Sequence, residues 1–224
     1  MEKKVKRKIN VKKVIFFVVF ILIICISVRI VLNERIRNIV ILNNNYYSDE
    51  EIIEAAKLEK YPKFILLNSS KVKKDLMKLD LIEDVKVYKK WGYILKLDIK
   101  EKKILYYVRS NNMYKASDGK DYSLEATGVP TLINYVPEDI EEKFIKNLSK
   151  VDSNIINMIS EIEYSKSNFD NDRFLLYMND GNEVYITTSK LNVLNKYVTI
   201  VTKLDGKKGI LYLDNGNYFE IKEK

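Results

Sequence analysis

One segment in the first half of the chain changes the spacing of its apolar side chains partway along. Val72, Leu76 and Leu79 recur every three or four residues, which predicts a helix with one apolar face. Over residues 85–99 the odd-numbered positions are mostly apolar and the even-numbered positions mostly polar. This alternation indicates two strands that each have one wet face, with Trp91-Gly92 as the turn between them. The segment is therefore predicted to form a helix followed by a β-hairpin.

Upstream patterns add a strand and a further helix. Ile39–Leu42 is a short apolar run followed by three Asn, which is typical of a strand and a turn. Ser48 and Glu51 have the spacing of a capping box at the start of a helix. The next helix is expected to be capped by Asn68, Ser69 or Ser70. The order strand, helix, helix, strand, strand predicts a three-stranded sheet with helices on one face.

The second half of the chain shows strand-like alternation more often than helical spacing. Asp118-Gly119 and Asp180-Gly181 are hairpin turn signals, and residues 127–137 are expected to break the chain between elements. We expect strands over 104–109 and 113–116, a helix beginning at Pro137, a strand over 159–165, a hairpin over 173–188, a helix over 191–204, and a strand, turn and strand over 210–221. The predicted fold class is α+β.

Residues 14–32 are apolar except for Ser27 and Arg29. A helix of this length covers about 28 Å, close to the hydrocarbon thickness of a bilayer. Seven Lys or Arg side chains precede the run, which predicts an N-terminus in the cytoplasm and residues 33–224 outside the membrane. A cleaved signal peptide is the alternative, but the run is long for one and no A-x-A-like site follows it.

The distribution of charge, the absence of His and the single Cys exclude several classes of function. Residues 1–13 carry +6 of the formal net charge of +8, so the exported part has no basic excess that would favour nucleic acid. The chain has no His, and its one Cys, Cys25, lies in the apolar run. These absences exclude imidazole catalysis, His-ligated metals and, in the exported part, disulfides and thiol nucleophiles. We expect no cofactor and no metal.

Two Ser-x-x-Lys sequences, Ser70–Lys73 and Ser117–Lys120, are the candidates for chemistry. This spacing occurs at the nucleophile of penicillin-binding proteins, but the accompanying S-D-N and K-T-G sequences are absent. Ser70 is explained as a helix cap and Ser117 as a turn residue. Neighbouring Asp and Glu side chains do not face a common site on a helix. We therefore expect no catalytic residues, with a membrane-anchored Ser–Lys envelope enzyme as an alternative.

The order of the elements and several short sequences resemble the FtsQ/DivIB family of bacterial cell-division proteins. The sequences are IVILNNNYYSDEEI and LMKLDLIEDVKVYKKWGYILKLDIKEKK in the first half, and GVPTLI, ISEI, DGNEVYI and GILYLDNGNYF in the second. The resemblance implies a basic cytoplasmic tail over 1–13, a transmembrane helix over 14–32, a POTRA-like domain of order β-α-α-β-β over 36–103 and a β-rich domain with packed helices over 104–224.

The resemblance also implies a function without catalysis. It implies a membrane-anchored scaffold at the division septum that binds other bitopic division proteins, FtsB/DivIC-like and FtsL-like, and helps recruit or regulate septal peptidoglycan synthesis. A POTRA-type module that handles polypeptides in protein export is the other alternative. The expected partners are therefore the lipid bilayer, those division proteins and the peptidoglycan synthesis machinery, with no nucleic acid.

The last strand is the segment where we expect a partner to bind. A chain-terminal strand is often a sheet edge, whose unpaired backbone groups accept a strand from another protein. The resemblance implies that a segment of an FtsB/DivIC-type partner adds there. Carried onto this chain, the candidate partner-binding residues are Gly209, Ile210, Leu211, Tyr212, Leu213, Tyr218 and Phe219. If this strand pairs inside the sheet instead, they are ordinary core residues, and β-propensity alone also places Tyr on strands.

Overall fold

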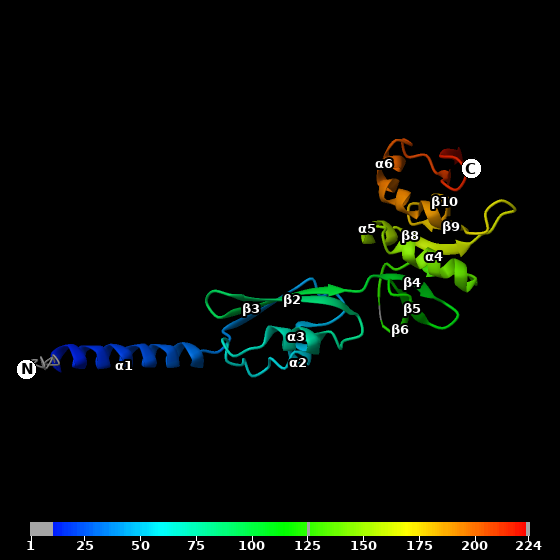
Figure 1. Ribbon diagram of the computed structural model, residues 1–224. Helices are drawn as coiled ribbons and strands as arrows, with labels where there is room; N and C mark the ends of the chain where they lie inside the picture. Colours follow the sequence, from blue (N-terminus) through cyan, green and yellow to red (C-terminus); the bar gives the residue numbers. More distant parts are fainter. Residues whose placement is uncertain (1–10, 125, 223–224) are drawn as a thin grey trace, which may run out of the picture. The chain divides into compact units, whose positions relative to one another are not determined.

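The computed structural model of the chain describes residues 11–124 and 126–222 (Figure 1). The chain divides after Glu101 into two compact units. The first unit contains the N-terminal helix and a three-stranded sheet, and the second contains a nine-stranded sheet. The order of elements confirms the predicted α+β class.

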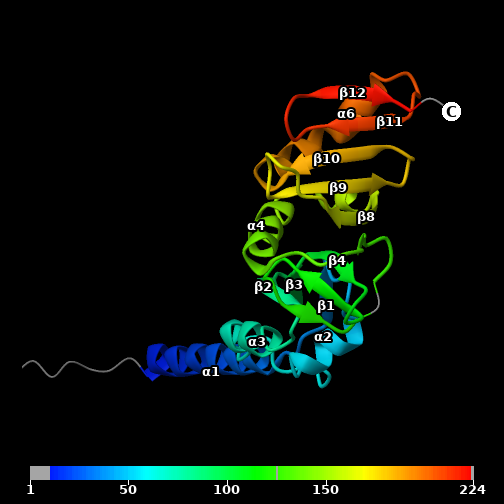
Figure 2. The ribbon, with the colours of Figure 1, turned by 90° about the vertical axis from the view of Figure 1, so that its right-hand side faces the viewer.

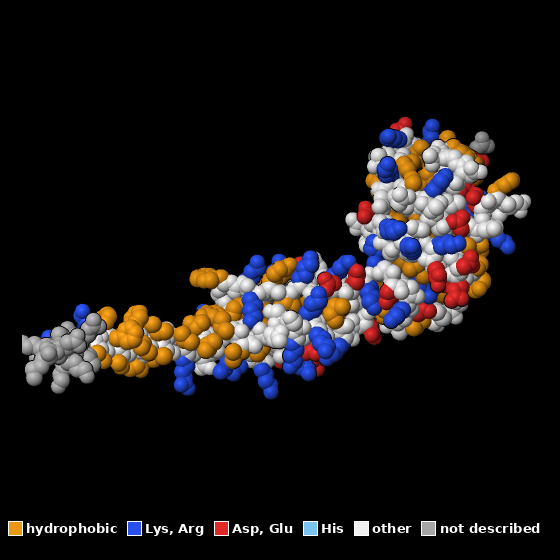
Figure 3. All heavy atoms as spheres, in the orientation of Figure 1, with side chains coloured by type: hydrophobic (Ala, Val, Ile, Leu, Met, Phe, Trp, Pro, Cys, Tyr) orange, Lys and Arg blue, Asp and Glu red, His pale blue; other side chains and the backbone are white. Residues whose placement is uncertain are grey.

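Helix α1 (Val11–Asn33) contains the whole predicted apolar run. Its large hydrophobic side chains from Val14 to Leu32 are exposed, and Figure 3 shows hydrophobic side chains along most of the helix. Among the described residues it is the one helix that is long and apolar enough to cross a membrane, judged by length and composition.

The first sheet is formed by β1 (Asn38–Leu42), β2 (Ile82–Lys90) and β3 (Ile94–Glu101), in the order β1-β3-β2. Strand β1 runs parallel to β3, and β2 and β3 form an antiparallel hairpin. Helices α2 (Asp49–Ala55) and α3 (Ser69–Leu76) lie between β1 and β2 in sequence and beside the sheet in space (Figure 1). Their apolar side chains share one hydrophobic core with the sheet. The predicted order strand, helix, helix, strand, strand is confirmed.

Local sequence explains where these helices and the hairpin turn begin. Ser48 and Glu51 form both hydrogen bonds of the predicted capping box at α2. Asn68, rather than Ser70, caps α3, because its Oδ1 accepts from the backbone N–H groups of Ser70 and Lys71. The turn between β2 and β3 has positive φ at Gly92 and at Tyr93, as a tight hairpin requires.

The second sheet has the order β12-β11-β10-β9-β8-β7-β4-β5-β6. Its strands are β4 (Ile104–Val108), β5 (Met113–Ala116), β6 (Asp121–Tyr122), β7 (Thr131–Leu132), β8 (Ile159–Tyr164), β9 (Arg173–Met178), β10 (Glu183–Thr187), β11 (Gly209–Tyr212) and β12 (Tyr218–Ile221). Figure 2 shows β8 to β12 side by side. The predicted hairpins around Asp118-Gly119 and Asp180-Gly181 are confirmed.

Strand β7 corrects one prediction from the sequence. Residues 127–137 were expected only to break the chain, but Thr131 and Leu132 pair in parallel with both β4 and β8. A strand of two residues is too short to show a period. It nevertheless joins the two halves of the sheet, because neither β4 nor β8 pairs directly with the other.

Four helices complete the second unit: α4 (Glu138–Leu148), α5 (Ser153–Ile156), the 3₁₀ helix η1 (Thr188–Lys196) and α6 (Tyr197–Thr202). Their apolar side chains belong to one core with the sheet, and the predicted face of α4 is buried in it. The single helix expected over 191–204 is wrong. Leu191, Leu194 and Tyr197 are fully buried at a spacing of three residues, which suits the three-residue turn of a 3₁₀ helix.

Candidate partner-binding edge

Strand β12 is one edge of the nine-stranded sheet. It pairs antiparallel with β11, from Gly209 opposite Ile221 to Tyr212 opposite Tyr218. Within the part of the chain that the structure describes, no strand lies along its other side. Strand β11, by contrast, is enclosed by β12 and by the parallel strand β10.

The backbone groups that face outward from β12 follow from the hydrogen-bond pattern. The N–H groups of Gly209 and Leu213 donate toward β10, to Asn182 Oδ1 at 3.1 Å and to the Tyr185 carbonyl at 2.8 Å. The backbone N–H and C=O groups of Ile210 and Tyr212 therefore point toward β12, because these groups point alternately to the two sides of a strand. Their partners are Tyr218 and Glu220, so the N–H and C=O groups of Phe219 and Ile221 point to the open edge.

The structure separates the candidate residues from the sequence into two groups. Gly209, Ile210, Leu211 and Tyr212 form β11 inside the sheet, and the side chains of Leu211 and Leu213 are buried in the core. These positions do not line an open edge, contrary to expectation, because the return of the chain through α6 places β11 beside β10. Only Tyr218 and Phe219 lie on the edge strand.

Two further residues of the edge were missed by the sequence reasoning. Glu220 and Ile221 complete β12, and Ile221 is half exposed. The alternation in Tyr218-Phe219-Glu220-Ile221 carries the signal, since Phe219 packs against the core while Tyr218 and Glu220 lie on the opposite face of the sheet.

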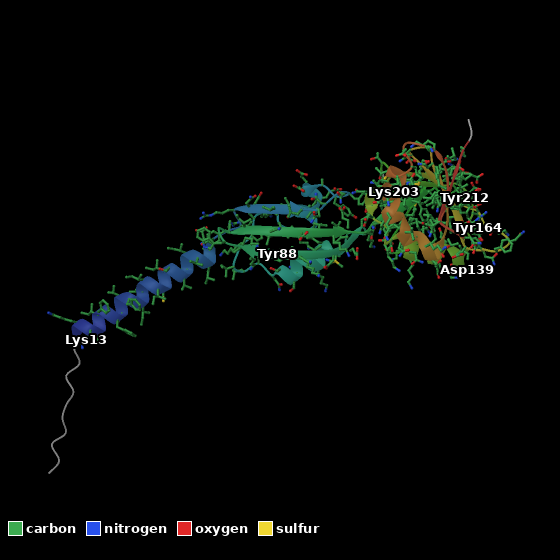
Figure 4. All side chains as sticks on the ribbon, turned by 90° about the horizontal axis from the view of Figure 1, so that it is seen from above. Lys13, Tyr88, Asp139, Tyr164, Lys203 and Tyr212 are labelled. Atoms are coloured by element: carbon green, nitrogen blue, oxygen red, sulfur yellow. The ribbon has the colours of Figure 1, made fainter. Side chains whose placement is uncertain are left out.

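A ladder of aromatic rings reaches the edge on that opposite face. Tyr185 of β10 stacks on Tyr212 of β11, with ring centroids 5.3 Å apart, and Tyr212 stacks on Tyr218 of β12 at 4.4 Å. The Arg173 guanidinium lies 4.5 Å from the centroid of the Tyr185 ring. Figure 4 labels Tyr212 among the side chains of the second unit. Burial and a 3.0 Å hydrogen bond to Glu220 raise the pKa of Tyr212 to about 12.

Gly209 allows β12 to approach β11 closely. A Cβ atom at this position would lie 2.0 Å from the Glu220 carbonyl oxygen and 2.9 Å from Cζ of Phe219. Any other residue would therefore displace the backbone of the edge strand. The edge strand can lie this close only because residue 209 has no Cβ atom, since the Glu220 carbonyl fills the place where one would be.

A buried polar network holds the first residue of β11. Asn182 is 2% exposed, and its side chain accepts from the Gly209 N–H and donates to Asp180 and to the Tyr197 hydroxyl. The Tyr197 hydroxyl donates to Asp180 Oδ2 at 2.9 Å. Burial, reinforced by the Asp180 carboxylate, raises the pKa of Tyr197. No buried side-chain polar atom among the described residues lacks a hydrogen-bond partner, and the bond from the Gly209 N–H to Asn182 ties this network to the start of β11.

The two Ser-x-x-Lys sequences form structural contacts. Ser70 is an exposed residue in the first turn of α3, and Lys73 pairs with Asp84. Ser117 Oγ accepts from the Lys103 backbone N–H at 3.2 Å. Among the described residues, no hydrogen bond joins Ser70 to Lys73 or Ser117 to Lys120. The Lys103 ammonium donates to the carbonyls of Ser149 and Val151, and burial lowers its pKa.

Two family models match the chain and together cover most of it. Residues 34–102 match the POTRA domain of FtsQ type, and residues 111–215 match the C-terminal domain of the cell division protein FtsQ/DivIB. The second match includes β11 and ends three residues before β12.

Relatives over nearly the full chain are cell division proteins named DivIB. The protein from Brevibacillus brevis is 28% identical over 97% of this chain and 87% of its own length. Those from Bacillus subtilis and Listeria monocytogenes are each 25% identical over 98% of this chain and 85% of their own lengths. A solved structure of the major extracytoplasmic domain of the trans isomer of DivIB from Geobacillus stearothermophilus aligns with 24% identity and a TM-score of 0.39, over 47% of this chain and 96% of that one. With both domain models in their expected order and DivIB proteins matching over 97–98% of its length, this chain belongs to the FtsQ/DivIB family of bacterial cell division proteins.

Proposed function

We propose that this protein is a non-catalytic, membrane-anchored scaffold of the division machinery. Its family supports a role in cell division, and α1 has the length and composition of a membrane anchor. The basic residues before the apolar run favour a cytoplasmic N-terminus, with both units on the outer side of the membrane. The expected location is the division septum.

The proposed mechanism is strand addition at β12. The outward N–H and C=O groups of Phe219 and Ile221 carry this proposal, because they can bond an extended segment of a partner as a sheet bonds its next strand. The exposed Tyr218 ring beside them supplies an aromatic contact for the side chains of the added strand. The family resemblance suggests an FtsB/DivIC-like bitopic protein as the partner, with an FtsL-like protein in the same assembly. Through them the scaffold would recruit or regulate septal peptidoglycan synthesis.

A pair of variants at Ile221 tests strand addition. Ile221→Pro removes an outward N–H and leaves the bonds between β12 and β11 in place, since proline is tolerated where its nitrogen faces away from the sheet. Binding of the extracytoplasmic segment of the organism's own FtsB/DivIC-like protein should weaken about 10-fold or more. Ile221→Ala keeps the N–H and serves as the control for the side chain.

The outcome is decided by affinity and melting temperature measured together. The proposal requires weaker binding by Ile221→Pro, near-normal binding by Ile221→Ala and similar melting of both. Unchanged binding by a folded Ile221→Pro variant would exclude strand addition here. A proline at Leu211 is unsuitable for this test, because Leu211 lies inside the sheet and in the core.

The cellular role is tested by the location of a tagged full-length chain in its own species. A band at mid-cell that appears with constriction is expected. An even distribution around the envelope would contradict the septal role and leave the export module and the Ser–Lys enzyme to be tested. An acylating active-site probe that labels Ser70 or Ser117 would favour the enzyme.

A further inference from the structure

Trp91, the only Trp in the chain, is almost completely exposed at the tip of the β2–β3 hairpin. Its side chain is 99% exposed, which is unusual for the largest apolar side chain. The turn itself does not require an indole, because Gly92 and Tyr93 adopt the positive φ values. The fold therefore gives no reason for a Trp at this position.

Chain connectivity places this tip next to the end of α1. The Arg37 N–H donates to the Tyr93 carbonyl at 2.9 Å, and Arg37 is four residues beyond Asn33, the last residue of α1. Four residues span at most about 14 Å. The Glu34 carbonyl already accepts from the N–H of Phe64, so the folded unit begins directly after the helix. Figure 1 shows the hairpin turn at the same end of the sheet as the start of β1.

Further exposed apolar side chains surround the tip. Lys89 Nζ donates to the Ile65 carbonyl, and Phe64 packs edge-on against Tyr93, which places the 61–66 segment beside the hairpin. Tyr88, which Figure 4 labels, lies on β2 three residues before Trp91. Tyr88 shares a face of β2 with Lys90, opposite the face from which Lys89 contacts the 61–66 segment, so exposed apolar side chains lie on both sides of the hairpin end. We call this end of the first unit the juxtamembrane face; its exposed apolar members are Tyr61, Ile65, Leu66, Tyr88 and Trp91.

The juxtamembrane face is also basic. Two acidic side chains accompany its basic ones, and of these Glu34 pairs with Arg37 at 3.4 Å while Glu59 is exposed. Its exposed basic residues are Arg35, Arg37, Lys60, Lys63, Lys89 and Lys90. The excess of positive charge favours an anionic surface as the occupant.

We propose that the juxtamembrane face docks onto anionic lipid headgroups of the leaflet from which α1 emerges. Trp and Tyr favour the headgroup layer because their rings are amphipathic, and Lys and Arg near the surface are attracted to anionic lipids. The headgroup layer is about 5–7 Å deep on each side, so the tip can reach it from the end of α1. Docking would restrain the first unit against the membrane. The inference rests on the span proposed for α1.

The single Trp makes the full-length protein its own probe. The chain is reconstituted into vesicles that contain phosphatidylglycerol, with or without lipids brominated near the headgroup end of their acyl chains. Docking predicts a blue-shifted Trp91 emission that the brominated lipids quench. The quenching should fall at high salt and in vesicles of phosphatidylcholine alone, because screening and neutral lipid weaken the electrostatic attraction.

Two variants give the controls. Trp91→Phe combined with Phe169→Trp moves the indole to a position in the second unit that is 91% exposed in the parent chain, and brominated lipid should not quench it. Lys63→Glu combined with Lys90→Glu keeps Trp91 and reverses two charges. The loss of each positive charge should lower the ratio of docked to undocked protein about fivefold, so the double variant should lower it about 25-fold or more.

Each outcome is decisive. Docking is overturned if brominated lipid does not quench Trp91, or if it quenches the relocated Trp to the same extent. It is also overturned if Trp91 becomes shielded only after a division partner is added. If the chain does not remain with the vesicles on flotation, the proposed span fails and docking fails with it. Strand addition at β12 is measured separately, so either proposal can fail alone.

Discussion

Replacing Gly209 with Ala should detach β12 from the sheet. The added Cβ would lie 2.0 Å from the Glu220 carbonyl oxygen, and the obstacle is backbone, so it cannot rotate away. The Glu220 carbonyl would have to move by about 1 Å or more to restore an ordinary contact. Strands β11 and β12 are held together by backbone hydrogen bonds between opposite residues, so a shift of this size disrupts their pairing.

The expected loss of stability is about 2 kcal/mol. Detachment gives up about four backbone hydrogen bonds at about 1 kcal/mol each, the stacking of Tyr212 on Tyr218 at about 1 kcal/mol and part of the burial of Phe219. The four released residues regain backbone entropy of about 1 kcal/mol each, which offsets much of this loss. The core of the second unit should survive, because the edge strand contributes only Phe219 to it.

Denaturant unfolding and amide hydrogen exchange measure the two parts of this prediction. Gly209→Ala should lower the free energy of unfolding and remove the exchange protection of the Tyr218 and Glu220 amides, while β8 to β10 stay protected. Gly206→Ala is the matched control, because Gly206 has a φ of +77° but open space around it, so it should lose about 1–2 kcal/mol and keep β12 protected. Full protection of β12 in Gly209→Ala would refute the steric argument.

Three further predictions concern a buried network, a helix cap and a titrating side chain. Asn182→Ala should lower the free energy of unfolding by about 1–3 kcal/mol in urea titrations, because it leaves the Gly209 N–H buried without its acceptor; an unchanged midpoint would contradict the network's role. Ser48→Ala should cost about 1 kcal/mol in the same assay by breaking the capping box with Glu51, and a loss below about 0.5 kcal/mol would argue against it. The raised pKa of Tyr212 contributes stability that is present below pH about 10 and is lost as the pH rises through about 12, so Tyr212→Phe should reduce the alkaline loss of stability; an equally steep loss in that variant would assign it to other groups.

Local patterns determined the first unit almost completely. The change of period after Val72, Leu76 and Leu79 predicted α3 and the β2–β3 hairpin, because helix and strand differ in spacing over a few neighbouring residues. The capping box of Ser48 and Glu51 was predictable for the same reason, since its partners are three residues apart.

In the second unit, contacts between distant residues decided several elements. Thr131 and Leu132 become a strand only because β4 and β8 flank them, and that pairing depends on residues more than 20 positions away in sequence. The 3₁₀ form of η1 follows from the burial of Leu191, Leu194 and Tyr197 against the core rather than from helix propensity. Neither the pairing of β7 nor the burial of η1 can be recognised in a short segment of the sequence.

The same distinction between local patterns and long-range contacts applies to the candidate partner-binding edge. The sequence by itself predicted two short strands joined by a turn over 210–221, and the resemblance to the FtsQ/DivIB family implied a partner site there. Only the tertiary structure decided which of the two is open, because the parallel pairing of β10 with β11 encloses Gly209–Tyr212 and leaves Phe219 and Ile221 facing outward. A strand's alternation defines its two faces, whereas its neighbours in the sheet are set by long-range packing.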